Sequence, residues 1–145
     1  MTSRPRAQNT IFTLAVTLMV IQVAYGVYWA GHDLSARLGL WPNEQLAEEF
    51  LNSLTFSQEA FFFSHVILNF VVLGLLLRRS RYTLPLFILS FILDRIEWVL
   101  MTDNTLFNQV FDGTILTISS FTLQALIIVL LTVLTFEISP TSRRA

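Results

Sequence analysis

The segment FILSFILDRIEWVLM (87–101) contains three ionisable residues, Asp94, Arg95 and Glu97, in an otherwise apolar run. An ionisable residue at the centre of a membrane-spanning helix costs about 2.5–3.5 kcal/mol on insertion scales and marks a candidate functional site. Asp94 and Glu97 are three residues apart and share a helix face, whereas Arg95 lies about 160° around the helix from Glu97. Arg95 is therefore badly placed to neutralise Glu97 within its own helix.

Each of the other apolar runs also contributes polar residues at this depth. Counting about 1.5 Å per residue inward from the outer ends of the spans puts His65, eight residues from Ser57, level with Asp94, nine residues from Asp103. Asn69 lies one turn from His65 on the same face. We expect these groups to form one polar layer inside a helix bundle. The predicted ligand- or ion-binding residues are Gln22, Tyr25, His65, Asn69, Asp94, Arg95, Glu97 and Gln124.

Two interpretations of this polar layer remain open at this point. The side chains could simply join the helices, through interhelical hydrogen bonds worth about 0.6–2 kcal/mol each and a buried ion pair of Arg95 with a carboxylate. Alternatively, they form a site for protons, cations or a small polar solute, with Asp94 or Glu97 as the titrating group. A haem held by two histidines would need His65 and His32, which differ in depth by nearly half a leaflet. No cofactor or metal is therefore predicted.

The elements that carry this layer are predicted from the apolar runs of the chain. Of its 145 residues, 54% are hydrophobic and 13% charged, with a mean hydropathy of +0.63, whereas soluble domains average about 25% charged residues. Four runs approach the roughly 20 residues needed to cross a bilayer, and they span residues 11–30, 60–77, 83–101 and 114–136. The first run exceeds a signal-peptide core in length and lacks a small-residue cleavage site. We predict an all-α integral membrane protein, a single domain formed by a four-transmembrane-helix bundle.

The charges flanking the runs predict the orientation. Seven arginines fall on one side of the predicted membrane, and the other side has seven carboxylates and Arg37. Arginine near a span stays in the cytoplasm, so both termini are predicted to be cytoplasmic (N-in/C-in). The nine basic residues include no lysine, which is typical of GC-rich bacterial genomes and favours the bacterial inner membrane. The seven arginines on the predicted cytoplasmic side are Arg4, Arg6, Arg78, Arg79, Arg81, Arg143 and Arg144.

The first outer loop contains a predicted amphipathic helix at residues 43–54, NEQLAEEFLNSL. Its apolar residues recur at i, i+4 and i+8 and its glutamates lie off that stripe, as in a helix at a membrane interface. Asn43 suits the N-cap of this helix, and Thr55 with Gln58 predicts a capping box for the next span. Trp29 and Trp98 are expected in the outer aromatic belt.

Composition excludes several classes of function. The net charge of −1 offers no basic excess for nucleic-acid binding, and the absence of cysteine excludes thiol catalysis and thiolate metal sites. We expect a small membrane transport or channel module that binds or relays a cation, proton or small polar solute. The alternative is a non-catalytic anchor or assembly subunit of a larger membrane complex; an enzyme acting on lipid or quinone would lack any recognisable motif. The expected partners are the lipid bilayer and other membrane subunits or a homo-oligomer, since Gly26 and Ala30 have small-xxx-small spacing.

Overall fold

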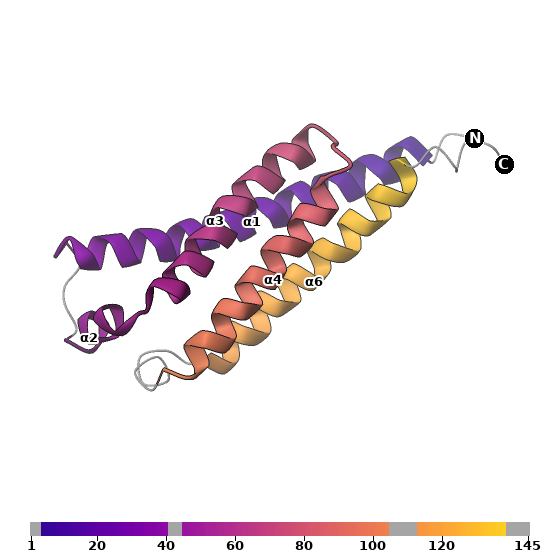
Figure 1. The fold of residues 1–145 in the computed structure, drawn as a ribbon. Helices are drawn as coiled ribbons and strands as arrows, with labels where there is room; N and C mark the ends of the chain where they lie inside the picture. Colours follow the sequence, from indigo (N-terminus) through magenta and orange to yellow (C-terminus); the bar gives the residue numbers. More distant parts are fainter. Residues whose placement is uncertain (1–3, 41–44, 105–112, 139–145) are drawn as a thin grey trace.

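The computed structural model describes residues 4–40, 45–104 and 113–138, which form one short and four long helices (Figure 1). These ranges contain no strand, so the all-α prediction is confirmed for them. The four predicted runs each lie inside a long helix, but the first helix is much longer than the 11–30 run. The helices are α1 (Arg4–Arg37), α2 (Gln45–Ser53), α3 (Phe56–Leu77), α4 (Thr83–Thr102) and α6 (Gly113–Ile138).

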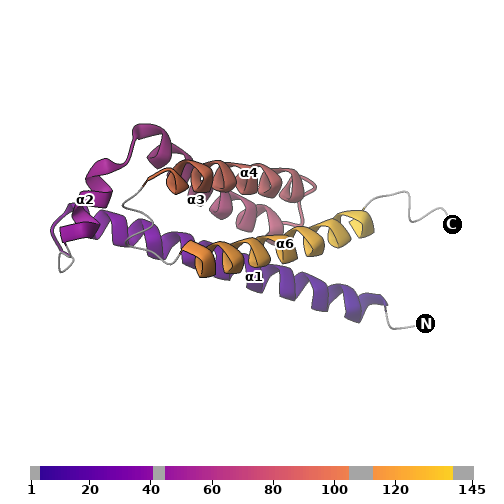
Figure 2. The same cartoon turned by 90° about the horizontal axis from the view of Figure 1, so that it is seen from below.

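The long helices form two layers. Figure 2 shows α1 beside α6 in one layer and α3 beside α4 in the other, and α3 makes its most extensive contacts with α4. The start of α1, the α3–α4 turn and the last turn of α6 lie at one end of the bundle, which we call the arginine end after Arg78, Arg79 and Arg81. The short helix α2 lies across the other end, the α2 end (Figure 2).

Local sequence signals account for the ends of α3 and α4. The Thr55 side chain accepts a hydrogen bond from the backbone N–H of Gln58, and the Gln58 Oε1 atom accepts one of 2.8 Å from the Thr55 N–H. The predicted capping box is thus confirmed. At the other end Arg79 adopts φ 52°, and the short 78–82 turn returns the chain as an antiparallel hairpin. Pro85 lies in the first turn of α4, where its missing N–H has no intrahelical partner to lose.

The amphipathic helix predicted for the loop is present as α2, Gln45–Ser53. Its Phe50 is buried against Met101 of α4, with Leu51, Leu54 and Trp98 packed around the pair. The predicted N-cap residue Asn43 lies outside the described residues. The described apolar side chains of α2 therefore pack against the α2 end of α4.

The apolar core fills the half of the bundle nearer the arginine end. It consists of side chains from all four long helices that are shielded almost completely from solvent. Its buried members are Ala15, Met19, Val23, Val72, Leu76, Phe87, Ile127, Leu131 and Leu134.

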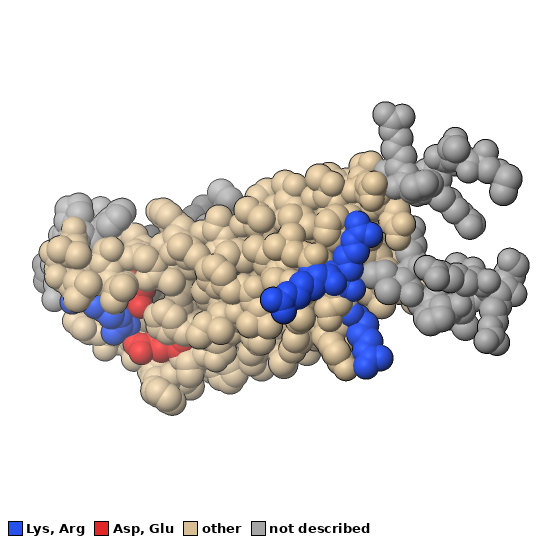
Figure 3. All heavy atoms as spheres, turned by 90° about the horizontal axis from the view of Figure 1, so that it is seen from above, with Lys and Arg blue, Asp and Glu red and all other residues tan. Residues whose placement is uncertain are grey.

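Three helices in the described part of the chain are long and apolar enough to cross a membrane, over the ranges Gln8–Arg37, Phe56–Leu77 and Thr117–Phe136. The predicted third span, α4, is not among them because it contains Asp94, Arg95 and Glu97. The described chain is therefore helical with three candidate membrane-spanning helices. The exterior is apolar in the middle, and on the face shown in Figure 3 the charged side chains gather near the two ends.

Gly26 has a different role from the one predicted. A Cβ atom at Gly26 would lie 3.2 Å from Val66 Cγ2 on α3, so this glycine allows α1 and α3 to approach within one chain. Its spacing with Ala30 therefore gives no support for a homo-oligomer.

A leucine at position 26 is expected to destabilise the bundle. The larger side chain must displace Val66, and overpacking of this kind costs about 1–3 kcal/mol. The matched control is Gly31→Leu on the same helix, because a Cβ at Gly31 meets no atom within 4 Å. Chemical unfolding in detergent, followed by circular dichroism, should show a lower free energy of unfolding for Gly26→Leu alone; equal losses in both variants would contradict the close approach.

Candidate functional site

The polar layer is built on the inward faces of α3 and α4. On α4, Ser90, Asp94 and Glu97 follow the i, i+4, i+7 spacing of one helix face, and on α3 His65 and Asn69 are one turn apart. All five are buried: His65 and Asp94 are each 5% exposed and Glu97 is 9% exposed. The short turn between the helices brings the two faces together at the same level.

His65 lies between the two carboxylates. Its Nδ1 atom is 3.2 Å from Glu97 Oε2, and its Nε2 atom is 3.6 Å from Asp94 Oδ1. The buried Nδ1 atom has no aligned hydrogen bond. Because an imidazole can accept a proton on one nitrogen and release one from the other, this arrangement could pass a proton between Glu97 and Asp94.

Asp94 is the carboxylate that Arg95 neutralises. Arg95 donates to Asp94 Oδ2 through Nη2 and through Nε at 2.9 Å, and Gln124 Nε2 of α6 donates to the same oxygen at 3.0 Å. Arg95 Nη2 also donates to Ser120 Oγ at 3.1 Å. Glu97 has no arginine partner among the described residues. The guanidinium also lies 5.6–5.9 Å from the ring centroids of Phe91, Trp98 and Phe121.

Ser90 makes hydrogen-bond contacts with Asn69 and with the main chain of His65. Ser90 Oγ lies 2.9 Å from Asn69 Oδ1 and 3.1 Å from the main-chain oxygen of His65. These contacts tie α3 to α4 one turn from the carboxylates. Ser90 therefore links Asn69 to the main chain of His65, and Asn69 does not itself face the cavity described next.

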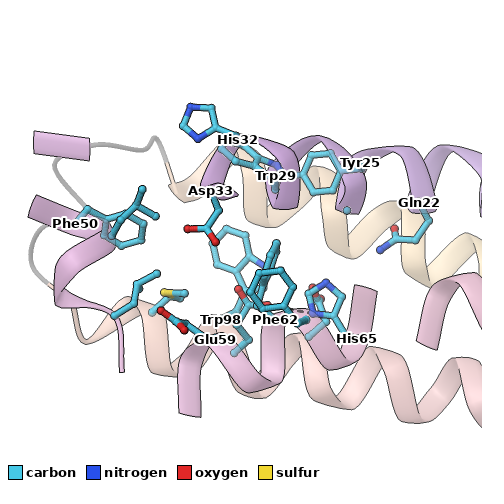
Figure 4. A pocket seen from close by; sticks show the side chains of 17 residues that line it. Gln22, Tyr25, Trp29, His32, Asp33, Phe50, Glu59, Phe62, His65 and Trp98 are labelled. Carbon is cyan, nitrogen blue, oxygen red and sulfur yellow. Dashed lines mark ion pairs between the residues drawn. The ribbon is translucent and has the colours of Figure 1, made fainter. Parts of the chain in front are cut away.

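A cavity of about 140 Å³ extends from the polar layer toward the α2 end, between α1 on one side and α3 with α4 on the other (Figure 4). Gln22 and His65 lie at its deeper end and Phe50 at the α2 end. Apart from Phe50, five aromatic side chains line it, and four carboxylates are spaced along it. The five are Tyr25, Trp29, Phe62, Phe63 and Trp98, and the carboxylates are Asp33, Glu59, Asp94 and Glu97.

Arg37 links the helices at the α2 end of this cavity. Its Nε atom lies 3.0 Å from Asp33 Oδ1 on α1, and its Nη2 atom lies 2.7 Å from Glu59 Oε1 on α3. All three side chains are partly exposed, so this bridge is worth little as a stabilising contact. Two carboxylates with one arginine leave this end of the cavity with net negative charge.

His65, Asp94 and Glu97 also form a group that could hold a metal ion, since each offers one ligand atom within 4.8 Å of the others. Imidazole and carboxylate suit several divalent ions. However, Arg95 and Gln124 already occupy one oxygen of Asp94. The two imidazole nitrogens also face different carboxylates, so the three ligands do not converge on a single point.

The eight predicted residues lie close together in the structure and fall into two groups. Five of them line the cavity, and they are Gln22, Tyr25, His65, Asp94 and Glu97. Of the other three, Arg95 and Gln124 donate hydrogen bonds to Asp94, and Asn69 accepts one from Ser90 Oγ.

Much of the cavity wall was not predicted from the sequence. Trp29 and Trp98, predicted for an outer aromatic belt, line the cavity, and so do Asp33 and Glu59, which were predicted only as outer charges. The part of the wall on α1 could have been predicted from helical spacing, because its residues share one helix face at successive intervals of three, one, three and four residues. These residues are Gln22, Tyr25, Gly26, Trp29 and Asp33.

Comparisons of this chain with protein-family models, with curated proteins and with solved structures found no match. Function is therefore inferred from the chemistry and geometry of the site.

Proposed function

We propose that this chain is a small transport module of the bacterial inner membrane, with four spans and cytoplasmic termini, and that its cavity binds a cation beside Glu97. The observation that carries the proposal is the unequal pairing of the two buried carboxylates. Arg95 neutralises Asp94, whereas Glu97 faces His65 and the cavity and has no arginine partner in the part of the chain that the structure describes. With a neutral imidazole and Glu97 ionised, the cluster would have one net negative charge, which a bound cation would balance.

We count α4, the predicted third span, among the four membrane-spanning helices, and its surface pattern supports this. The 20 residues of α4 correspond to about 30 Å, the thickness of the hydrocarbon core. Asp94 and Glu97 point into the bundle, and the Arg95 side chain, 22% exposed, lies beside aromatic rings. Apart from Thr102 at the last position, the large exposed side chains of α4 are apolar, and they include Ile88, Leu89, Ile92, Ile96 and Val99.

The direction of access also favours uptake from the non-cytoplasmic side. Beyond His65 and Gln22, the apolar core closes the bundle toward the arginine end. In the proposed orientation the carboxylates Asp33 and Glu59 face the incoming cation. Opposite charges at a mouth raise the local concentration of a charged ligand.

The proposed orientation predicts which positions an impermeant thiol reagent can reach. The native chain has no cysteine, so single cysteines are clean reporters. In intact cells Ser53→Cys, in α2, should be labelled, while Ser80→Cys, in the α3–α4 turn, should be labelled only after the membrane is permeabilised. Labelling of Ser80→Cys from outside would contradict the orientation.

Cation binding itself is tested by thermal unfolding of the purified full chain in lipid nanodiscs. A ligand that binds only the folded state stabilises it by RT ln(1 + [L]/Kd), or about 2.7 kcal/mol at one hundred times Kd. We expect at least one of Na⁺, Zn²⁺ and methylammonium, added as chlorides at constant chloride concentration, to raise Tm in a saturable way. A Tm that is independent of all three cations would contradict the proposal.

A further inference from the structure

We propose that the ligand of this cavity is a small organic ammonium with an aromatic body, its cationic head between Glu97 and Gln22 and its body among the rings nearer the α2 end. This inference rests on the proposed function and names its ligand class.

The size of the cavity exceeds what a bare ion needs. An engineered apolar cavity of about 150 Å³ is large enough to bind benzene, and the cavity here measures about 140 Å³. A single water-sized ion would leave most of this volume unfilled. A ring bearing one short ammonium arm matches the volume and the elongated arrangement of polar and apolar walls.

The wall is chemically divided along its length. Asp94 and Glu97 lie beside His65, which forms the deep end with Gln22. Aromatic side chains line the section between this deep end and the carboxylates Asp33 and Glu59 near the α2 end, and they include Trp29, Phe62 and Trp98. Aromatic faces attract ammonium groups through their negative quadrupole and also bury apolar rings. A ligand with a cationic head and an aromatic body satisfies both sections at once, which neither a simple ion nor a neutral hydrocarbon does.

The side-chain oxygen of Gln22 supports placing the ammonium head at the deep end of the cavity. Gln22 lines the cavity and is 3% exposed, yet its Oε1 atom accepts no hydrogen bond in the described part of the chain. Buried polar atoms in native proteins almost always have a partner. An ammonium between α1 and α4 would donate to Gln22 Oε1 and to the Glu97 carboxylate.

The deep end is less suited to an inorganic cation. Calcium takes six to eight oxygen ligands, while the cavity lining at this depth offers oxygens mainly from Gln22, Asp94 and Glu97. Tetrahedral zinc requires its ligand atoms at about 2.0–2.2 Å from one point. That would require Asp94 to leave Arg95 or His65 to turn away from one of its two carboxylates.

The test is calorimetric titration of the purified full chain in lipid nanodiscs, with empty nanodiscs titrated to subtract partitioning into lipid. The probes are benzylammonium, its neutral analogue of equal size ethylbenzene, methylammonium, Na⁺ and Zn²⁺. We expect one benzylammonium per chain, bound at least about tenfold more tightly than ethylbenzene or methylammonium. Trp29→Leu should remove most of the preference over methylammonium. The matched control Phe136→Leu changes an exposed ring on α6 near the arginine end and should leave the preference intact.

The outcomes separate this inference from the function on which it rests. Saturable binding of Na⁺, Zn²⁺ or methylammonium without a preference for benzylammonium would overturn the ligand class and leave cation binding standing. Binding of ethylbenzene as tight as that of benzylammonium would also overturn it, because the head would then contribute nothing. If none of the cations binds, both proposals fail.

Discussion

Replacing Glu97 with glutamine is expected to leave the bundle folded and to weaken cation binding by at least about tenfold, which corresponds to about 1.4 kcal/mol. The amide keeps the shape of the side chain but removes a buried carboxylate that has no arginine partner among the residues described. A hydrogen bond to a charged group contributes about 1.5–3 kcal/mol, so the loss should be easy to measure. Calorimetry gives the affinity, and circular dichroism checks the fold.

The matched control for this variant is Glu59→Gln. Glu59 also lines the cavity, but it is partly exposed and paired with Arg37 at the α2 end. We expect about a twofold change in affinity, because solvent screens charges at this position. Wild-type affinity in Glu97→Gln would show that the polar layer only joins helices.

Replacing Arg95 with glutamine is expected to cause the largest loss of stability, about 3–5 kcal/mol, since it leaves the buried Asp94 carboxylate without its cation. The double variant Asp94→Asn with Arg95→Gln should recover most of this loss, because neutral replacements of buried ion pairs are often tolerated. Chemical unfolding in detergent provides the measurement. A double variant as unstable as Arg95→Gln alone would contradict the pairing.

Arg37→Gln provides the comparison for an exposed arginine. Its ion pairs with Asp33 and Glu59 lie at the partly exposed α2 end, and such pairs contribute about 0–1 kcal/mol. A loss as large as that of Arg95→Gln would mean that the bridge at the α2 end stabilises the whole bundle.

The position of His65 beside Asp94 could be predicted because it depends only on the length of the α3–α4 turn and on helical spacing. A short turn joins α3 and α4, so residues at equal distances from that turn must lie level, and helical spacing selects the inward face. The capping box of α3 was predictable for the same reason, since its partners are three residues apart. Local geometry determines both features.

The cavity was harder to predict because helices distant in the sequence form it. The 11–30 run underestimated α1, since polar residues beyond Ala30 continue the helix to Arg37, and this extension supplies Asp33 to the wall. Nothing in the loop sequence specifies that α2 folds back over Met101. Helical spacing alone disfavours pairing of Arg95 with Glu97, but it does not reveal that Ser120 and Gln124 of α6 add hydrogen bonds to the Arg95–Asp94 pair.

The most direct test of the account is a solid-state NMR distance between ¹⁵N-benzylammonium and the side-chain carboxyl carbons of ¹³C-labelled glutamates in the full chain, measured in lipid. A charge-assisted contact predicts a dipolar coupling for a separation within about 4 Å. The coupling should persist in Glu59→Gln and disappear in Glu97→Gln. A coupling that survives in Glu97→Gln, or none in the wild-type chain at saturating ligand, would contradict the assignment of Glu97 as the cation-binding carboxylate.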